Sequence, residues 1–182
     1  MVQERLTKLV AEIQKPDFLA GKGLSNEVNI RIFCYEPNEE MLIRHFIAEL
    51  RTKKLKCRLK IYNLYEVFLA ICDKNRIMDA IYKMEANKGK DFLLRQLRRV
   101  TDNKAFVEEM AYTPHSVGDV ILLTGVGEVF PFMRLHSLLE AMQVDFSDVP
   151  IVVFYPGKYD GRSLTLFNKL KPNAYYRAFN EL

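Results

Sequence analysis

Two short segments, residues 119–124 and 149–155, are apolar at almost every position and limit the fold more than any other feature. They read Asp-Val-Ile-Leu-Leu-Thr and Val-Pro-Ile-Val-Val-Phe-Tyr. A strand that is covered by helices on both faces has this continuous apolar pattern, whereas a strand with one solvent face alternates. Both segments therefore predict central strands of a mostly parallel sheet.

Two other segments alternate and predict strands nearer the sheet margin. Residues 28–35 place apolar side chains at every second position, with a partner face that is half polar. Residues 55–62 alternate strictly, so one face is expected to be buried and the other to form a cationic ribbon. Lysines discourage edge-to-edge pairing, and this strand therefore suits the edge of the sheet. Its apolar positions are Leu55, Cys57, Leu59 and Ile61, and its cations are Lys56, Arg58 and Lys60.

Helical periodicity fills most of the remaining chain. Helices are predicted at residues 2–14, from Asn38 to about residue 54, and from near Pro131 to about residue 142. Residues 64–111 carry helical stripes throughout and predict a helical insertion. The whole chain, 1–182, is thus expected to be one α/β domain with a Rossmann- or flavodoxin-like sheet of about four to five strands, flanked by helices. A further short helix or strand is predicted at 164–170, and a last strand at 175–179.

The expected strand order is 2-1-3-4, with strands numbered along the sequence. In that order the connections change direction between strands 1 and 3, where α/β proteins favour ligand binding. The crevice would be lined by Glu36–Asn38 and Gly125–Glu128.

Composition indicates a cytoplasmic protein that does not enter a membrane. No apolar run approaches the roughly 18 residues that cross a bilayer, and the first 14 residues lack a signal-peptide core. Three cysteines, Cys34, Cys57 and Cys72, make no Cys-x-x-Cys pair, which argues against a disulfide framework or a zinc site. The net charge is +4, and 21 of the 27 Lys and Arg lie in residues 1–111 beside 16 of the 23 Asp and Glu.

The segment Thr124-Gly125-Val126-Gly127 follows a buried strand and invites comparison with a phosphate loop. Both the Walker and the dinucleotide patterns fail, because Phe130 stands where each requires glycine. Glu128 also opposes an anion. A degenerate nucleotide site stays open as one hypothesis, beside a tight turn into a helix that has Pro131 at its first position. No catalytic set, metal site or cofactor is predicted.

Residues 154–161 combine aromatic and turn-forming residues. Pro156-Gly157 and Asp160-Gly161 each suit a turn, which would expose the nearby tyrosines. Asp160 lacks a second carboxylate and is a weak catalytic candidate. A turn or a protein contact is the preferred interpretation.

Two basic sets suggest contact with nucleic acid, which requires clustered cations. Both sets are also the expected solvent faces of their elements. The first is Arg51, Lys53, Lys54, Lys56, Arg58 and Lys60; the second is Lys88, Lys90, Arg95, Arg98, Arg99 and Lys104.

Several C-terminal motifs together resemble the BrxB family, small proteins of the BREX bacteriophage-exclusion systems. They are Leu122–Gly127, Pro131-Phe132 with Arg134, His136 and Leu138-Leu139, then Val149-Pro150, Phe154–Gly161, Leu164, Leu166-Phe167 and Tyr175–Phe179. The family's size matches nearly the whole chain, while the N-terminal part matches mainly in its pattern of elements.

The resemblance implies an accessory protein of a multi-gene defence system that methylates host DNA and blocks phage replication. The methyltransferase, the large ATPase and the alkaline-phosphatase-like PglZ protein are separate chains of such systems. The family has no established catalytic residues to transfer. The expected function is therefore a non-enzymatic adaptor that binds other BREX proteins, foremost PglZ, with DNA binding as the alternative, directly or through the assembly. Tyrosine and arginine dominate interface energetics, so the expected partner surface comprises Tyr155, Tyr159, Asp160, Tyr175, Tyr176 and Arg177.

Overall fold

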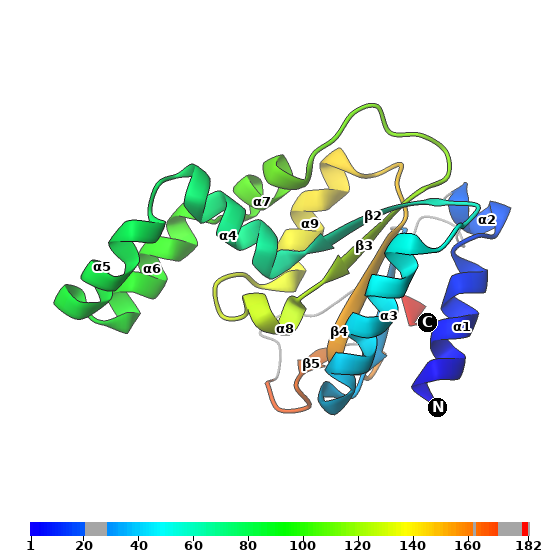
Figure 1. The fold of residues 1–182 in the computed structure, drawn as a ribbon, viewed down its shortest axis with the longest axis horizontal. Coiled ribbons are helices and arrows are strands. Elements are labelled where there is room, and N and C mark those ends of the chain that lie inside the picture. The colour runs from blue at the N-terminus through cyan, green and yellow to red at the C-terminus, as the bar shows by residue number, and fades with distance from the viewer. Residues whose placement is uncertain (21–28, 162, 171–179, 182) are drawn as a thin grey trace.

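A parallel sheet forms the centre of the computed structural model, which describes residues 1–20, 29–161, 163–170 and 180–181 (Figure 1). Five parallel strands have the order β2-β3-β4-β1-β6, and β5 pairs antiparallel with the end of β4. The predicted α/β class is thus confirmed. The strands are β1 (Ile30–Tyr35), β2 (Arg58–Asn63), β3 (Asp119–Thr124), β4 (Ile151–Tyr159), β5 (Leu164–Leu166) and β6 (Asn180–Glu181).

Helices cover both faces of the sheet. One face carries α1 (Val2–Glu12), α2 (Pro16–Leu19) and α3 (Glu40–Thr52), the last preceded by the 3-10 turn η1 (Pro37–Glu39). The opposite face carries α4 (Leu64–Lys74), α7 (Asn103–Met110), α8 (Val126–Val129) and α9 (Leu135–Asp145). None of the helices in the described part of the chain is long and apolar enough to span a bilayer.

The two faces follow from the handedness of the connections. The chain passes from β1 through α3 to β2, three positions along the sheet, and then returns one position at a time to β3 and β4. Parallel crossovers are right-handed, so reversing the direction moves the connecting helices to the opposite face. Val120 and Leu122 accordingly pack toward α3, while Ile121 and Leu123 pack toward α4 and α9.

The predicted strand order 2-1-3-4 is wrong, because β1 pairs with β4 and β6 rather than with β2. The half-polar appearance of residues 28–35 misled the prediction. Phe33 and Tyr35 are buried against α3 and α1, while Ile32 and Cys34 are buried on the other face, so β1 is an interior strand. Its only side chain within the strand that is not buried is Arg31.

Strand β2 lies at the edge, as its alternation predicts. Among the described strands it pairs with β3 alone, and its six residues are exposed or half-buried. Cys57, just before the strand, is buried, as are Cys34 and Cys72. All three serve as small apolar core residues.

A helical hairpin projects from the body of the molecule. Between α4 and α7 the chain forms the 3-10 turn η2 (Met78–Ala80), α5 (Ile81–Lys88) and α6 (Lys90–Val100). Figure 1 shows α5 and α6 standing apart from the sheet. No residue of α5 is buried, and α6 buries only Leu93 and Leu97. Within residues 64–111, therefore, α4 and α7 cover the sheet while α5 and α6 do not.

The predicted turn at Pro156-Gly157 is wrong, because both residues continue β4. Gly157 pairs with Leu166 of β5, and the turn falls at Asp160-Gly161 instead. Glycine is needed here for close approach: a Cβ on Gly157 would lie 2.1 Å from the carbonyl oxygen of Thr165. The continuation of β4 also buries Tyr155, which is only 4% exposed.

Replacing Gly157 with alanine is expected to separate β4 from β5, because the contacting atom belongs to rigid backbone. The free energy of unfolding should fall by about 1–3 kcal/mol, measured by urea denaturation. Hydrogen exchange at the Phe167 amide, which donates to the Pro156 carbonyl of β4 at 2.8 Å, should accelerate in Gly157→Ala. Lys158→Ala, at an exposed position of the same strand, should leave that exchange unchanged; equal acceleration in both variants would contradict the packing argument.

Candidate functional site

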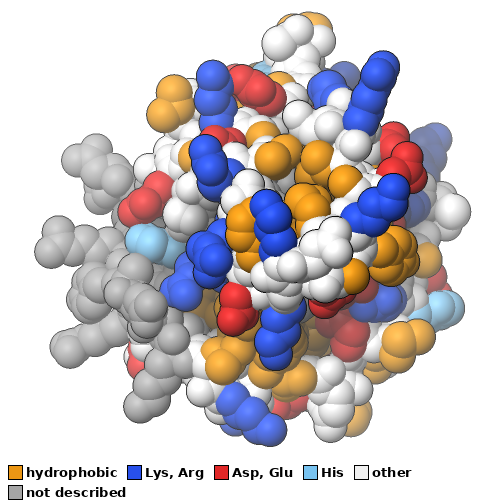
Figure 2. Space-filling view, turned by 90° about the vertical axis from the view of Figure 1, so that its left-hand side faces the viewer, with side chains coloured by type: hydrophobic (Ala, Val, Ile, Leu, Met, Phe, Trp, Pro, Cys, Tyr) orange, Lys and Arg blue, Asp and Glu red, His pale blue; other side chains and the backbone are white. Residues whose placement is uncertain are grey.

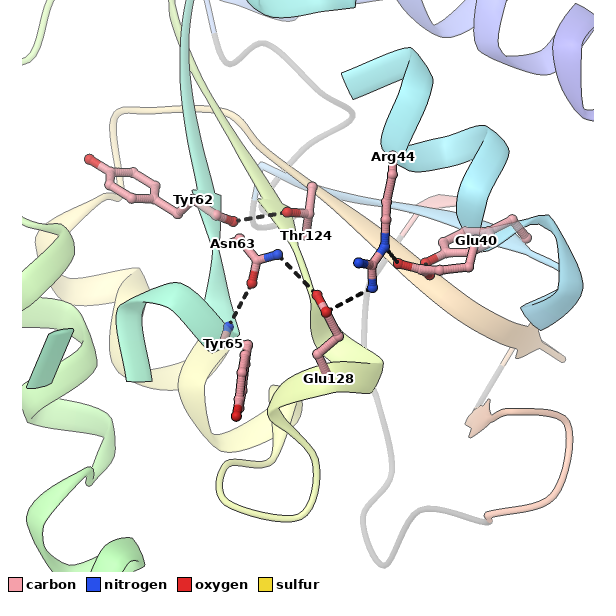
Figure 3. A network of polar contacts seen from close by, with 8 residues as sticks. Glu40, Arg44, Tyr62, Asn63, Tyr65, Thr124 and Glu128 are labelled. Atoms are coloured by element: carbon pink, nitrogen blue, oxygen red, sulfur yellow. Dashed lines mark hydrogen bonds and ion pairs between the residues drawn. The ribbon is translucent and has the colours of Figure 1, made fainter. Parts of the chain in front are cut away.

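A polar network joins the carboxyl ends of β1, β2 and β3, the edge at which parallel α/β sheets bind ligands (Figure 3). Arg44 of α3 is its centre. Its Nε lies 2.9 Å from Glu40 Oε1, and a terminal guanidinium nitrogen lies 2.7 Å from Glu128 Oε1. Helix α3 follows β1, and Glu128 belongs to α8, which follows β3. Arg44 therefore links two helices that lie on opposite faces of the sheet.

Asn63 continues the network at the end of β2. Its Nδ2 donates to Glu128 Oε2 at 3.0 Å, while its Oδ1 accepts from the backbone amides of Tyr65 at 2.8 Å and Glu66 at 3.3 Å. The side chain thus caps the N-terminus of α4. Gly125 permits this arrangement, because a Cβ there would lie 2.3 Å from Asn63 Oδ1 and the residue has a φ of 71°.

Tyr35 anchors the network from β1. Its hydroxyl donates to Glu40 Oε2 at 2.5 Å. Burial, reinforced by this hydrogen bond, raises the pKa of Tyr35 far above its ordinary value. The hydrogen bond to Glu40 and the contact with Glu128 raise the pKa of the Arg44 guanidinium as well. A small pocket of about 220 Å³ lies beside these groups, with Arg51, Glu66 and Thr124 also on its wall.

The charged groups of this network pair with one another and hold the loops at the carboxyl edge together. The carboxylates of Glu40 and Glu128 each contact Arg44, and Glu128 also accepts a hydrogen bond from Asn63. A phosphate placed at Gly125–Glu128 would meet the Glu128 carboxylate, which argues against the degenerate nucleotide site. Among the described residues, no group of three or more His, Cys, Asp and Glu side chains is arranged to hold a metal ion.

The structure separates the residues of the predicted partner surface. Tyr155 is buried in the core, so its expected exposure is wrong. Tyr159 is half-buried against the same core, and Asp160 is exposed, with its carboxylate accepting from the Ser163 amide at 2.6 Å and hydroxyl at 2.9 Å. Tyr175, Tyr176, Arg177 and the predicted strand at 175–179 lie outside the described residues.

The first basic set divides between the two faces of the sheet. Arg51, Lys53, Lys54 and Lys56 are exposed at the end of α3 and in the turn before β2. Arg58 and Lys60 lie on the α7 face instead. Arg58 pairs with buried Asp119 at 2.7 Å, and the Lys60 ammonium sits 4.5 Å from the centre of the Tyr112 ring. The expected continuous cationic ribbon therefore does not form.

Most of the second basic set lies on the projecting hairpin. Lys88, Lys90, Arg95, Arg98 and Arg99 are all exposed on α5 and α6. Two of them make specific contacts. The Arg98 guanidinium donates twice to the Pro131 carbonyl, at 2.7 and 2.9 Å, and the Lys88 ammonium lies 4.5 Å from the centre of the Phe92 ring. Lys104 lies on α7 and pairs with Glu108 at 3.6 Å.

Sequence reasoning missed Arg44, Glu40 and Asn63. A signal existed for Asn63, which directly precedes an apolar helix and is a favoured N-cap residue. Glu40 and Arg44 have the i, i+4 spacing of a helix ion pair, which alone predicts only a surface contact. Their link to Glu128 depends on the strand order, which periodicity did not provide.

Fold and site together define a parallel α/β protein with a closed ion-pair network at its carboxyl edge and a projecting helical hairpin. The family model for "BREX protein BrxB" matches residues 60–181. A protein of that name from Bacillus cereus (strain H3081.97) is 37% identical, covering 98% of this chain and 96% of its own length. One from Escherichia coli O9:H4 (strain HS) is 26% identical, covering 98% and 90%.

The chain therefore belongs to the BrxB family of BREX proteins. The resemblance expected from the C-terminal motifs is confirmed, and the relatives extend it to the N-terminal part. No solved structure gives a significant match.

Ionisation of Tyr35 is expected to weaken the fold at high pH. Below about pH 10 the phenol is protonated in both folded and unfolded chains. Above it the unfolded chain loses this proton while the folded protein retains it, so the free energy of unfolding falls by up to about 1.4 kcal/mol per pH unit. Urea denaturation between pH 9 and 11 should give a shallower slope for Tyr35→Phe than for the wild type. The control Tyr82→Phe, at an 82% exposed position, should keep the wild-type slope.

Proposed function

We propose that this protein is a non-enzymatic adaptor of a BREX phage-defence system, and that it binds other BREX proteins, the PglZ alkaline-phosphatase-like protein foremost. Membership of the BrxB family supports its place among BREX proteins. The observation that carries the adaptor role is the projecting helical hairpin, η2 with α5 and α6. Its exposed side chains have the composition of an interaction surface, and we call them the hairpin surface.

The hairpin surface mixes apolar and cationic groups. Tyr82 is 82% exposed and Met78 is 37% exposed. Figure 2 shows this end of the molecule, where lysine and arginine side chains stand around and between hydrophobic ones. Large exposed apolar groups with a charged rim are typical of protein contact sites.

The requirements of the fold do not explain why the side chains on the outer face of α5 are exposed. Helix α5 packs Ile81 and Met84 toward the core but buries no residue fully, and the exposed Tyr82 lies outside this stripe. Helix α6 is tied to the body through Leu93, Leu97 and the Arg98 contact with Pro131. The hairpin is therefore held at its α6 side while α5 stays open to a partner.

Truncating Tyr82 is expected to weaken partner binding. Exposed tyrosines that become buried in an interface are frequent hot spots, and Tyr82→Ala should cost about 1–3 kcal/mol, roughly a 5- to 150-fold rise in Kd. The PglZ-type protein of the same BREX system should co-elute with the wild type on a sizing column. Calorimetry should then measure the loss of affinity in Tyr82→Ala.

Val117→Ala is the matched control, since Val117 is 92% exposed but lies on the connection between α7 and β3. It should bind like the wild type. Tyr159→Ala, Asp160→Ala and a Tyr175→Ala, Tyr176→Ala, Arg177→Ala triple variant test the C-terminal surface expected from sequence. If Tyr82→Ala bound the partner with wild-type affinity while these variants lost affinity, the partner contact would lie on the C-terminal surface instead of the hairpin. Separate elution of the two wild-type proteins at micromolar concentration would refute a tight binary complex.

The exposed cations of the hairpin favour DNA binding as the second candidate function. Lys90, Arg95 and Arg99 make no ion pair with any described residue, and such groups can displace phosphate counterions. DNA binding predicts gel shifts of a short duplex that weaken steeply with salt and with the triple change Lys90→Gln, Arg95→Gln, Arg99→Gln. Lys53→Gln, Lys54→Gln and Lys56→Gln test the first basic set without exposing Asp119. An absence of any shift at low salt would exclude this candidate.

A further inference from the structure

The outer edge of β2 has unpaired backbone. Arg58 donates its amide to the Gly118 carbonyl at 2.8 Å, and the Tyr62 carbonyl accepts from the side-chain hydroxyl of Thr124 in β3 at 3.4 Å. Alternate residues of a strand direct their backbone groups to the same side, so residues 58, 60 and 62 face β3. The amides and carbonyls of Leu59 and Ile61 therefore point outward, where no strand in the described part of the chain pairs with them.

A groove of about 280 Å³ adjoins this edge, with apolar side chains in its floor and two cations in its lining. Its floor is formed by one face of β2 and the turn before it, together with Leu50 of α3. Leu55, Leu59 and Ile61 are only half-buried, because α3 reaches across the sheet without covering its last strand. Cys57 lies in the same floor. Side chains of an added strand would find apolar contacts here.

Positive charge surrounds one end of this groove. Arg51 and Lys53 line it, and Lys54 and Lys56 are exposed in the adjoining turn. None of these four forms an ion pair with a described residue. Acidic side chains would complement this end.

The cations that should protect the edge are engaged elsewhere. Lysine or arginine on an edge strand normally discourages the addition of another strand. Arg58 is held by Asp119, and the Lys60 ammonium lies over Tyr112, both on the α7 face. The groove face of β2 carries no charged residue of its own, since it presents Leu59 and Ile61, with Cys57 in the turn before the strand.

We infer that the β2 edge binds an extended segment of a partner protein that has apolar residues at alternate positions and acidic residues at one end. The segment adds to the sheet as a further strand beside Leu59 and Ile61, so its alternate apolar side chains enter the groove and the acidic residues at its end lie near Arg51 and Lys53. Strand addition gains affinity from backbone hydrogen bonds and specificity from alternate side-chain pockets. The six residues of β2 span about 20 Å, so a segment of about six residues suffices. The inference rests on the proposed adaptor function and gives the chemistry of one of its partners.

Nucleic acid fits this site less well. Phosphates would use Arg51, Lys53, Lys54 and Lys56, but they would leave the apolar floor and the outward amides of β2 unsatisfied. A protein strand uses all three features.

The test uses the full chain and two labelled octapeptides, an acidic one, Glu-Glu-Thr-Val-Thr-Val-Glu-Glu, and a basic one, Lys-Lys-Thr-Val-Thr-Val-Lys-Lys, with charges at both ends so that either strand direction is served. Fluorescence anisotropy should show saturable binding of the acidic peptide and none of the basic one. Leu59→Pro removes one outward amide at an edge position where proline is tolerated, and it should reduce affinity at least about tenfold. The double charge reversal Arg51→Glu, Lys53→Glu leaves the backbone intact and should reduce affinity similarly. Circular dichroism confirms that each variant is folded, and Val117→Ala should bind like the wild type.

Three results would overturn the inference. These are no binding of the acidic peptide at millimolar concentration, equal binding of both peptides, or wild-type affinity in folded Leu59→Pro and in the charge reversal. A duplex that binds the wild type and is lost in the same charge reversal would assign the edge to nucleic acid instead. Peptide binding without co-elution of any BREX protein would leave the edge site standing and refute the adaptor function, so the two failures are distinguishable.

Discussion

Burial of β3 and β4 on both faces is the constraint on which the rest of the structure depends. Val120, Ile121, Leu122 and Leu123 are all fully buried, as Val152 and Val153 are in the next strand. At roughly 1.5–3 kcal/mol for each large apolar side chain taken out of water, these strands require helices on both sides. Charged groups are then excluded from the middle of these strands and lie at the sheet margins, on the outer faces of the helices and on the hairpin.

The carboxyl edge shows how one such margin is neutralised. Three connections meet there, and each brings polar groups that would otherwise compete for solvent. Arg44 satisfies two carboxylates, Asn63 satisfies one carboxylate and two helix amides, and Gly125 leaves room for Asn63. This edge binds ligands in many α/β proteins, but here its polar groups bond to one another. The groups that we propose for partner binding therefore lie at β2 and on the hairpin.

Sequence pattern predicted the elements better than their arrangement. The continuous apolar runs identified β3 and β4 as central, and strict alternation identified β2 as an edge, because burial acts locally on each strand. Strand order failed because β1 and β4 pair through backbone groups, which carry no side-chain signature. Tyr155 and Gly157 failed for a related reason: β4 continues through a proline and a glycine because Gly157 admits the backbone of β5, a partner that lies beyond the predicted turn.

The two inferred surfaces are joined by one stretch of chain. Strand β2 leads directly into α4, and α4 leads into η2, α5 and α6. A partner that adds a strand to β2 and also contacts Tyr82 would bind two sites linked by a helix packed on the sheet rather than by a flexible linker. A rigid link of matched length raises the effective concentration of the second contact, so modest affinities at each site combine into a tight complex. Helix α4, which packs Val67, Phe68 and Ile71 into the core, thereby acts as the spacer that fixes the distance between the sheet edge and the hairpin.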